Sequence, residues 1–133
     1  MLNNKDVLIV TNNSKVFIKY KENYNIEFID SKTMYEVLIK TRDLLHLGYK
    51  LLTHPMSGSL KSNQTPYKSI LLMKNKNFEN AYFDDILMIE NTIENYNKFI
   101  KNRHLTNWTE NIKNDFKTVD LSLIESCFNK NIP

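Results

Sequence analysis

Two short runs of the sequence are apolar at every position, and they constrain the fold more than any other feature. The first is Val7-Leu8-Ile9-Val10 and the second is Ile70-Leu71-Leu72-Met73. A strand with one face in water alternates apolar and polar residues, whereas a strand covered on both faces does not. Both runs therefore predict strands in a sheet with helices on its two sides, the arrangement typical of a parallel sheet in an α/β protein.

Two further strands and two helices are expected between these runs. The strands correspond to 26–29 and 49–53. One helix is expected after the cap-forming asparagines and serine that follow the first strand, and a second after the T-x-x-E capping box of Thr33 and Glu36. Gly48 would end the second helix. The inward stripe of that helix would be Val37, Leu38, Thr41, Leu44 and Leu45.

The last third of the chain predicts two helices. The first would be capped by Asp84 or Asp85, although 86–89 also fits a short fifth strand. Its inward residues would be Ile86, Ile89, Ile93, Tyr96 and Ile100. The second helix would be capped by Thr109, and its apolar stripe would be Ile112, Phe116, Val119, Leu123 and Cys127.

This order of elements predicts one α/β domain over residues 1–133, with three layers and a helical C-terminal third. The sheet would be four-stranded and mostly parallel. Right-handed crossovers and short connections favour a strand order such as 2-1-3-4, while the direction of the fourth strand stays open. No boundary between two domains is visible, because 75–80 is a polar loop rather than a long linker.

Composition and charge exclude several classes of protein. The formal net charge is only +3 and the lysines form no basic stripe, which argues against nucleic-acid binding. The single cysteine, Cys127, cannot form a disulfide within the chain, which agrees with a reducing cytoplasm. The sequence has no apolar run near 18 residues and no signal peptide, so neither a membrane span nor secretion is expected.

Common cofactor and metal motifs are also absent from the sequence. Two glycines cannot supply a G-x-G-x-x-G dinucleotide fingerprint, and there is no P-loop. Three isolated histidines and one cysteine show no metal-ligand spacing. We therefore predict no cofactor and no metal site.

The connection THPMSGSLKSNQTPYKS, residues 53–69, is the strongest candidate for a site. Ligands of open parallel sheets bind outside the carboxyl ends of the strands, where residues 11–13 and 53–55 would meet. Hydroxyl groups, amides, lysines and a helix N-terminus there suit a small anion or another polar ligand. The predicted ligand-binding residues are Thr11, Asn12, Asn13, Thr53, His54, Ser57, Gly58, Ser59, Lys61, Asn63, Thr65 and Lys68.

Two alternatives stay open for these residues. The loop is also explained as a stiffened connection, and His54 as a hydrogen-bonded structural residue, whereas the catalytic hypothesis makes His54 an acid or base. On the second expected helix, a polar face opposite the core stripe is either a solvated surface or an interaction face. That face consists of Ile39, Arg42, Asp43 and His46.

The segments 37–48, 50–59 and 63–69 resemble the GrdX family, and the resemblance extends over about 7–100. Its specific part is the H-P-x-S-G-S…T-P-Y-K-S run, in which Ser62 replaces an expected proline. Members of this family are small proteins encoded beside the glycine, sarcosine and betaine reductase genes of amino-acid-fermenting anaerobes.

The resemblance implies a cytoplasmic accessory protein of that reductase system, without implying a reaction. The chain lacks the cysteine-rich or selenocysteine motifs of the catalytic subunits. We therefore expect a non-catalytic accessory protein that binds a small anionic or polar ligand. The alternatives are a small enzyme that uses His54, and an interaction module that docks a reductase subunit. An exposed sheet edge is also compatible with a homodimer.

Overall fold

The computed structural model describes residues 4–55, 65–74, 83–102 and 108–131. A short 3-10 helix (Asn4–Asp6) leads into the first strand. The elements that follow are β1 (Val7–Thr11), α1 (Ser14–Tyr20), β2 (Asn25–Phe28), α2 (Tyr35–His46), β3 (Lys50–Leu51), β4 (Ser69–Met73), α3 (Phe83–Asn102) and α4 (Glu110–Asn131). The four strands expected from the sequence are thus present, and the two last elements are long helices.

The sheet is mixed, so the prediction of a mostly parallel sheet with the order 2-1-3-4 is wrong. The observed order is β2-β1-β4-β3. β1 and β2 are parallel, with Ile9 opposite Ile26, whereas β4 is antiparallel to both β1 and β3. β1 therefore lies between β2 and β4, and β3 lies at the edge of the sheet.

The connection between β3 and β4 accounts for this difference. A parallel neighbour needs a crossover that carries the chain back along the sheet, and such a crossover usually contains a helix. The described residues between β3 and β4, 52–55 and 65–68, contain no helix, and β4 runs back antiparallel to β3. The apolar run 70–73 correctly indicated burial on both faces, but such burial leaves the strand direction undetermined.

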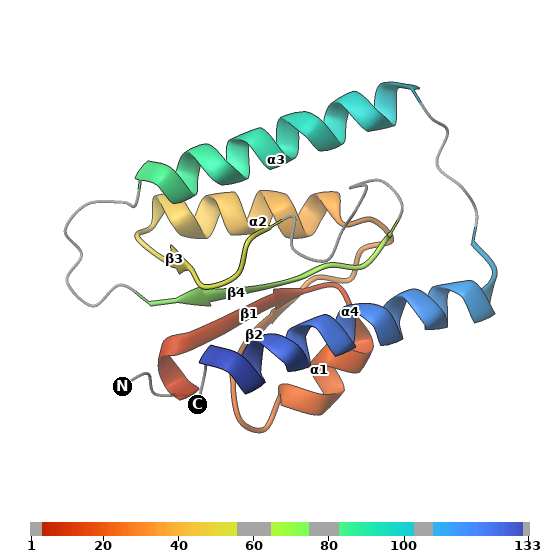
Figure 1. Cartoon of the computed structure of the whole chain (residues 1–133), viewed down its shortest axis with the longest axis horizontal. Helices are drawn as coiled ribbons and strands as arrows, with labels where there is room; N and C mark the ends of the chain where they lie inside the picture. Colours follow the sequence, from red (N-terminus) through yellow and green to blue (C-terminus); the bar gives the residue numbers. More distant parts are fainter. Residues whose placement is uncertain (1–3, 56–64, 75–82, 103–107, 132–133) are drawn as a thin grey trace.

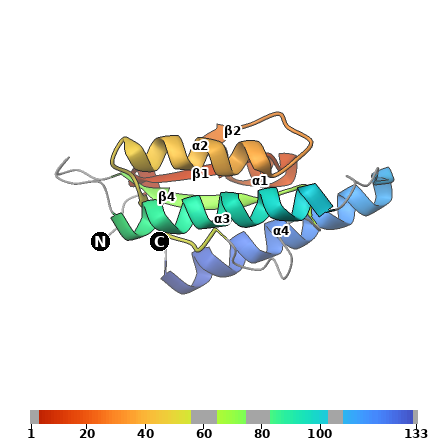
Figure 2. The same cartoon turned by 90° about the horizontal axis from the view of Figure 1, so that it is seen from above.

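Helices cover both faces of the sheet (Figure 1). α2 and α3 pack on one face, and α1 and α4 pack on the other. Seen from above, α2 and α3 run side by side over the strands (Figure 2). Because neighbouring residues of a strand point to opposite faces, Ile70 and Leu72 join the core below α2 and α3, whereas Leu71 joins the core against α1 and α4.

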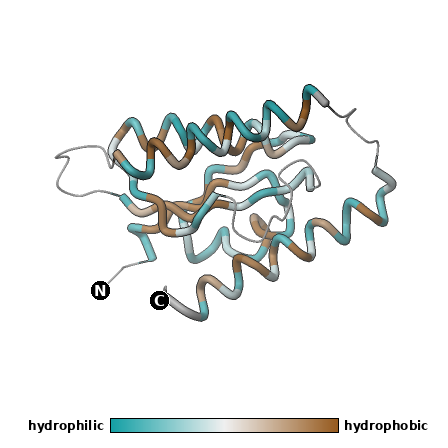
Figure 3. Tube along the Cα trace, turned by 45° about the horizontal axis from the view of Figure 1, so that its top comes forward, coloured by the Kyte–Doolittle hydropathy of each residue, from teal (hydrophilic) through white to brown (hydrophobic). Residues whose placement is uncertain are grey.

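Apolar residues concentrate on the strands and on the inward sides of the helices (Figure 3). α2 follows this pattern closely, and all five residues of its predicted stripe are buried. They are Val37, Leu38, Thr41, Leu44 and Leu45.

The C-terminus of α2 is closed by Gly48, as predicted. Its φ of 104° lies in the region that favours glycine. The N–H groups of Gly48 and Tyr49 donate to the carbonyl oxygens of Leu45 and Leu44, at 3.0 and 3.2 Å. This pair of bonds is a Schellman motif, which satisfies carbonyl groups that a helix end leaves unpaired.

The N-terminus of α2 departs from the predicted capping box. Met34 is the N-cap, and no side chain caps the helix there. The Thr33 hydroxyl instead donates to the Glu36 carboxylate at 2.6 Å, and the Ser31 hydroxyl donates to the same oxygen at 2.5 Å. Burial raises the pKa of Glu36, but these two hydrogen bonds, together with one from the backbone, outweigh it and leave the pKa below its ordinary value.

The open alternative at 86–89 is settled, because these residues belong to α3. Ile89, Ile93 and Tyr96 are buried in the core that α3 shares with α2, as expected for the inward residues of that helix. In the described part of the chain, no helix combines the length and apolar character needed to cross a bilayer.

α4 is rotated relative to its predicted orientation. Asp120 and Ile124 are buried, whereas Val119 and Leu123 of the expected inward stripe are 56% and 36% exposed. The helix therefore turns a carboxylate toward the end of the sheet.

Candidate functional site

The carboxyl end of β1 and the amino end of β4 carry a buried polar network, in which Thr11 lies opposite Ser69. The Ser69 hydroxyl donates to Oδ2 of Asp120 at 2.6 Å, and the Ser69 N–H donates to Oδ1 at 3.1 Å. Since the Ser69 proton is directed to the carboxylate, the 2.7 Å contact between the two hydroxyls assigns Thr11 as its donor. The Thr11 oxygen in turn accepts from the N–H of Asn13 at 3.0 Å.

Asn13 connects this network to two helices. It is the N-cap of α1, and its Oδ1 accepts from the N–H of Lys15 at 3.0 Å. Its Nδ2 donates to the carbonyl oxygen of Lys117 at 2.9 Å and to Oδ2 of Asp120 at 3.0 Å. The side chain of Asn13 therefore uses its hydrogen-bonding capacity within the fold, although the sequence predicted it to bind a ligand.

Asn12 fixes the chain that enters β4. Its Nδ2 contacts the carbonyl oxygens of Ser31, Thr33 and Pro66 at 3.3, 3.1 and 2.8 Å. Its Oδ1 accepts from the N–H of Lys68 at 3.0 Å. These contacts hold the loop before α2 and the segment before β4 against the end of β1.

A small cavity lies beside this network. Its volume of about 10 Å³ is close to the space of one water molecule. The residues that line it are Thr53, His54, Lys68, Ser69, Asp120, Leu123, Ile124 and Cys127. Lys68 and Asp120 are only 4% and 6% exposed, so the fold holds a buried amine and a buried carboxyl group at one cavity.

Burial shifts both of these groups toward their neutral forms. It lowers the pKa of Lys68, an effect that Asp120 and then Cys127 partly oppose. Burial also raises the pKa of Asp120, against hydrogen bonds from Ser69 and Asn13 and the charge of Lys68. A buried pair of ionisable groups contributes little to the stability of a fold. Groups whose pKa values are shifted by burial cluster at functional sites.

The structure brings several predicted ligand-binding residues to this end of the sheet. His54 is exposed at the cavity, and the Thr53 hydroxyl accepts from the N–H of Leu71 at 3.1 Å. The Thr65 hydroxyl contacts the backbone of Tyr67, donating to its carbonyl oxygen at 3.2 Å. The remaining predicted residues, Ser57, Gly58, Ser59, Lys61 and Asn63, lie outside the described residues.

The predicted interaction face on α2 is partly covered. Ile39 is half-buried and packs against the core between α2 and the sheet. Nε of Arg42 forms an ion pair with Glu90 of α3 at 3.7 Å. Asp43 and His46 are exposed. The four residues therefore occupy different environments rather than one open surface.

Sequence reasoning missed Asp120 and Ser69. Asp120 lies next to Val119 of the expected inward stripe, whereas the stripe that packs in the core is Leu121, Ile124 and Phe128. Ser69 is the last residue of the candidate connection 53–69, but it is not among the predicted ligand-binding residues. A carboxylate one position after an apolar stripe residue is a weak signal, because most such carboxylates face solvent.

None of the described residues forms a group of three or more histidines, cysteines or acids that could hold a metal ion. The fold and the network define a three-layer α/β protein whose sheet is closed at one end by a buried carboxylate from its last helix. A family model described as GrdX-like protein matches residues 8–129, so this chain belongs to the GrdX-like protein family. Neither the curated proteins nor the solved structures compared with the chain gave a match. The family points to an accessory protein linked to glycine reductase.

Proposed function

We propose that this protein is a non-catalytic accessory of the glycine, sarcosine and betaine reductase system that binds a small polar ligand. The binding site is the cavity at the end of the sheet, together with the connection 53–68. The observation that carries the proposal is the burial of Lys68 against Asp120 at this cavity. Membership of the GrdX-like family supports the link to the reductase system.

The chemistry of the cavity matches a ligand that both donates and accepts hydrogen bonds. Lys68 supplies a donor, Asp120 supplies acceptor oxygens, and the imidazole of His54 can do either. The cavity has room for about one water molecule, so one polar group of a ligand would enter it from the side of His54, which is exposed. Buried groups that already lie in position lose little entropy when they bind.

A thermal-shift screen tests this proposal. The compounds are glycine, sarcosine, betaine, acetyl phosphate and inorganic phosphate. A ligand at about 100 times its dissociation constant adds about 2.7 kcal/mol, which is a shift of several degrees for a chain of this size. We expect Lys68→Met to abolish the shift and His54→Ala to reduce it.

His46→Ala is the matched control, because His46 is an exposed histidine on α2. It should leave the shift unchanged. The double change Ser57→Ala with Ser59→Ala tests the predicted part of the loop. A shift that survives both Lys68→Met and His54→Ala contradicts the proposed site. Turnover of any compound that depends on His54 would assign the cavity to an enzyme instead.

A further inference from the structure

A groove outside the proposed site runs between α2 and α3. Its volume of about 500 Å³ lies within the range of about 300–1,000 Å³ that is typical of sites for small molecules. The two helices lie side by side (Figure 2) and run in opposite directions. Tyr35 and Arg42 line the groove from α2, and Glu90, Ile93 and Asn97 are among the residues that line it from α3. The groove therefore combines charged, amide and apolar side chains.

Two contacts fix the order of these side chains along the groove. The Tyr35 ring stacks on Tyr96 with the ring centroids 5.8 Å apart, and Nε of Arg42 lies 3.7 Å from Oε1 of Glu90. Two helical turns separate Tyr35 from Arg42, which corresponds to about 10 Å along the axis of α2. Ile93 follows Glu90 by about one turn of α3. The groove therefore has a cationic part at Arg42 and an aromatic part at Tyr35.

The guanidinium group of Arg42 has donors that the fold does not use. Its side chain is 34% exposed, and its contact with Glu90 is longer than a hydrogen bond. Within the described residues Arg42 makes no hydrogen bond, although a guanidinium carries five N–H donors. Because Glu90 approaches at Nε, the two terminal nitrogens remain available to an anion in the groove.

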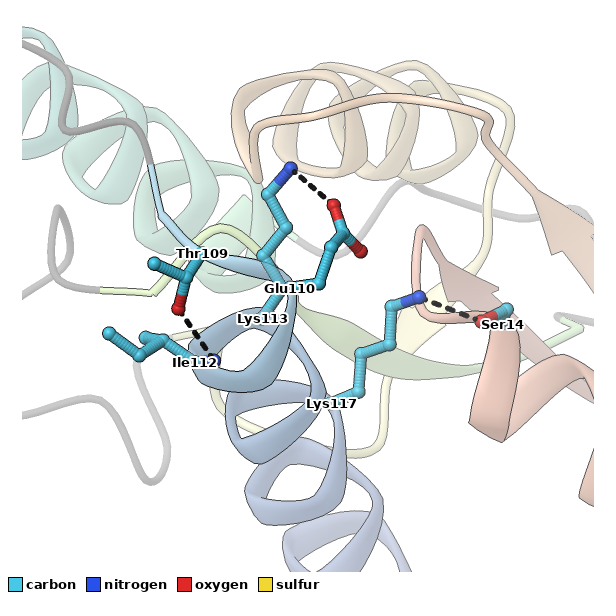
Figure 4. A network of polar contacts seen from close by, with 6 residues as sticks. All are labelled: Ser14, Thr109, Glu110, Ile112, Lys113 and Lys117. Carbon is cyan, nitrogen blue, oxygen red and sulfur yellow. Dashed lines mark hydrogen bonds and ion pairs between the residues drawn. The ribbon is translucent and has the colours of Figure 1, made fainter.

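Cations at the start of α4 differ from Arg42 in this respect. Nζ of Lys117 donates to the Ser14 hydroxyl at 3.1 Å, and Nζ of Lys113 contacts Oε1 of Glu110 at 3.5 Å (Figure 4). Polar groups of the fold thus engage these two ammonium groups, whereas the N–H donors of Arg42 are open to a ligand.

The charges around the groove leave a small positive excess. The lining contains three cations, Arg42, Lys98 and Lys101, and two carboxylates, Glu90 and Glu94. Lys98 pairs with Glu94 at 3.5 Å, while Lys101 forms no ion pair within the described residues. The formal excess is one positive charge, three minus two. This excess matches a monoanion such as a carboxylate, whereas Glu90 would repel a dianionic phosphate more strongly.

We propose that this groove binds a small organic acid, with its carboxylate on the terminal nitrogens of Arg42 and its apolar part toward Tyr35 and Ile93. A carboxylate fits a planar guanidinium through two parallel hydrogen bonds, which also fix its orientation. Ile93 belongs to the core and Tyr35 packs against it, so the two side chains offer a fixed apolar surface. The groove shares no lining residue with the cavity at Lys68, and the inference does not depend on the proposed function.

Titration with benzoate, followed by amide chemical shifts at constant ionic strength, tests the site. Benzoate joins one carboxylate to an apolar ring, and its shifts should concentrate on α2 and α3. Acetate lacks the ring and benzyl alcohol lacks the charge, so both should bind at least about tenfold more weakly. Arg42→Gln should weaken benzoate binding about tenfold. Glu90→Gln removes the carboxylate beside Arg42 and should strengthen the binding by up to about fivefold.

Lys40→Gln is the matched control for Arg42→Gln. Lys40 stands on the same helix, its side chain is 39% exposed, and its ion pair with Glu27 measures 3.6 Å, yet it does not line the groove. This variant should leave benzoate binding unchanged. The gain expected in Glu90→Gln keeps the test decisive if Arg42→Gln does not fold.

Each other outcome overturns the inference. Absence of shifts with benzoate does so directly, and an equal loss in Lys40→Gln would reduce the effect to net charge. Equal binding of benzyl alcohol would show that the guanidinium plays no part. Shifts confined to the surroundings of His54 and Lys68 would place benzoate in the cavity instead. A glutamate-rich peptide that binds through Arg42 where benzoate does not would assign the groove to a protein partner.

Discussion

Ser69 and Asp120 join β4 to α4 through two hydrogen bonds, one from the serine hydroxyl and one from its backbone N–H. The two residues are 51 positions apart in the sequence. Both carboxylate oxygens are thereby used, and Oδ2 also accepts from Asn13. Asp120 is therefore the acceptor on which three donors of the sheet end depend.

Removing this acceptor should destabilise the protein strongly. Asp120→Ala leaves the two donors of Ser69 and one of Asn13 buried without partners, and it leaves Lys68 without its carboxylate. We expect a loss of about 3–5 kcal/mol in the free energy of unfolding, measured by urea denaturation. Glu125→Ala is the control, because Glu125 forms an exposed ion pair with Lys19, and it should cost less than about 1 kcal/mol. Equal effects of the two changes would contradict the network.

Lys68 should make stability depend on alkaline pH. Burial lowers its pKa in the folded protein, so over the range just below 10.5 the unfolded chain binds the extra proton. The contribution of Lys68 to stability is therefore complete above pH 10.5 and is lost as the pH falls through the folded pKa. The unfolding free energy of the unmodified protein, relative to that of Lys68→Met, should rise with pH in this range. A difference that stays constant with pH would contradict burial of the amine.

Tyr20 should make the free energy of unfolding fall, rather than rise, with increasing pH. Burial, followed by the nearby Glu125 and Tyr24, raises the pKa of Tyr20 to about 12. The contribution of its neutral phenol to stability is complete below pH 10 and is lost as the pH rises toward 12. Tyr20→Phe should flatten the decline of stability between pH 10 and about 12. Absorbance titration of the phenol groups should also lose a late step in this variant.

Asn12 should behave as a structural residue. Asn12→Asp keeps the size of the side chain and the acceptor for Lys68, but it sets a carboxylate oxygen against the carbonyl oxygens of Ser31, Thr33 and Pro66. We expect a loss of at least about 2 kcal/mol in urea denaturation. Asn25→Asp is a suitable comparison, since Asn25 is exposed and its side chain makes one hydrogen bond within the described residues, to the carbonyl oxygen of Lys5. Full stability of Asn12→Asp would show that its amide is not needed.

Gly48 should tolerate alanine poorly for a reason confined to the backbone. A Cβ at this position would meet no atom within 4 Å, so no clash is expected. The φ of 104° nevertheless disfavours any residue with a Cβ, at a cost of about 1–2 kcal/mol. Thermal unfolding should show this loss in Gly48→Ala, whereas Leu47→Ala, at a side chain that is 71% exposed, should change stability by about 0.5 kcal/mol or less.

Local features of the fold were predictable from the sequence. The stripe of α2 and the glycine that ends this helix follow from spacing and from backbone preference. The resemblance to the GrdX family, expected over about 7–100, is confirmed over residues 8–129. These features depend on residues that are neighbours in the chain.

Features that depend on distant partners were not predictable in the same way. The apolar run of β4 indicates burial on both faces of the sheet, but it is equally compatible with a parallel and with an antiparallel strand. The observed orientation of α4 packs Leu121, Ile124 and Phe128, a second apolar stripe at helical spacing, against the core. The hydrogen bonds that Asp120 accepts from Ser69 and Asn13 favour this face over the expected one, and these partners lie 51 and 107 residues away.

The position of β4 determines when the sheet can form. β4 separates β1 from β3, yet it is the last of the described strands in the chain. Until residue 73 has left the ribosome, β1 can pair only with β2, and its other edge stays open. The carboxylate that completes the sheet end is made later still, at residue 120. A nascent chain that stops between these two points would carry a paired sheet with unsatisfied donors at its end, and would be exposed to proteases and misfolding during that interval.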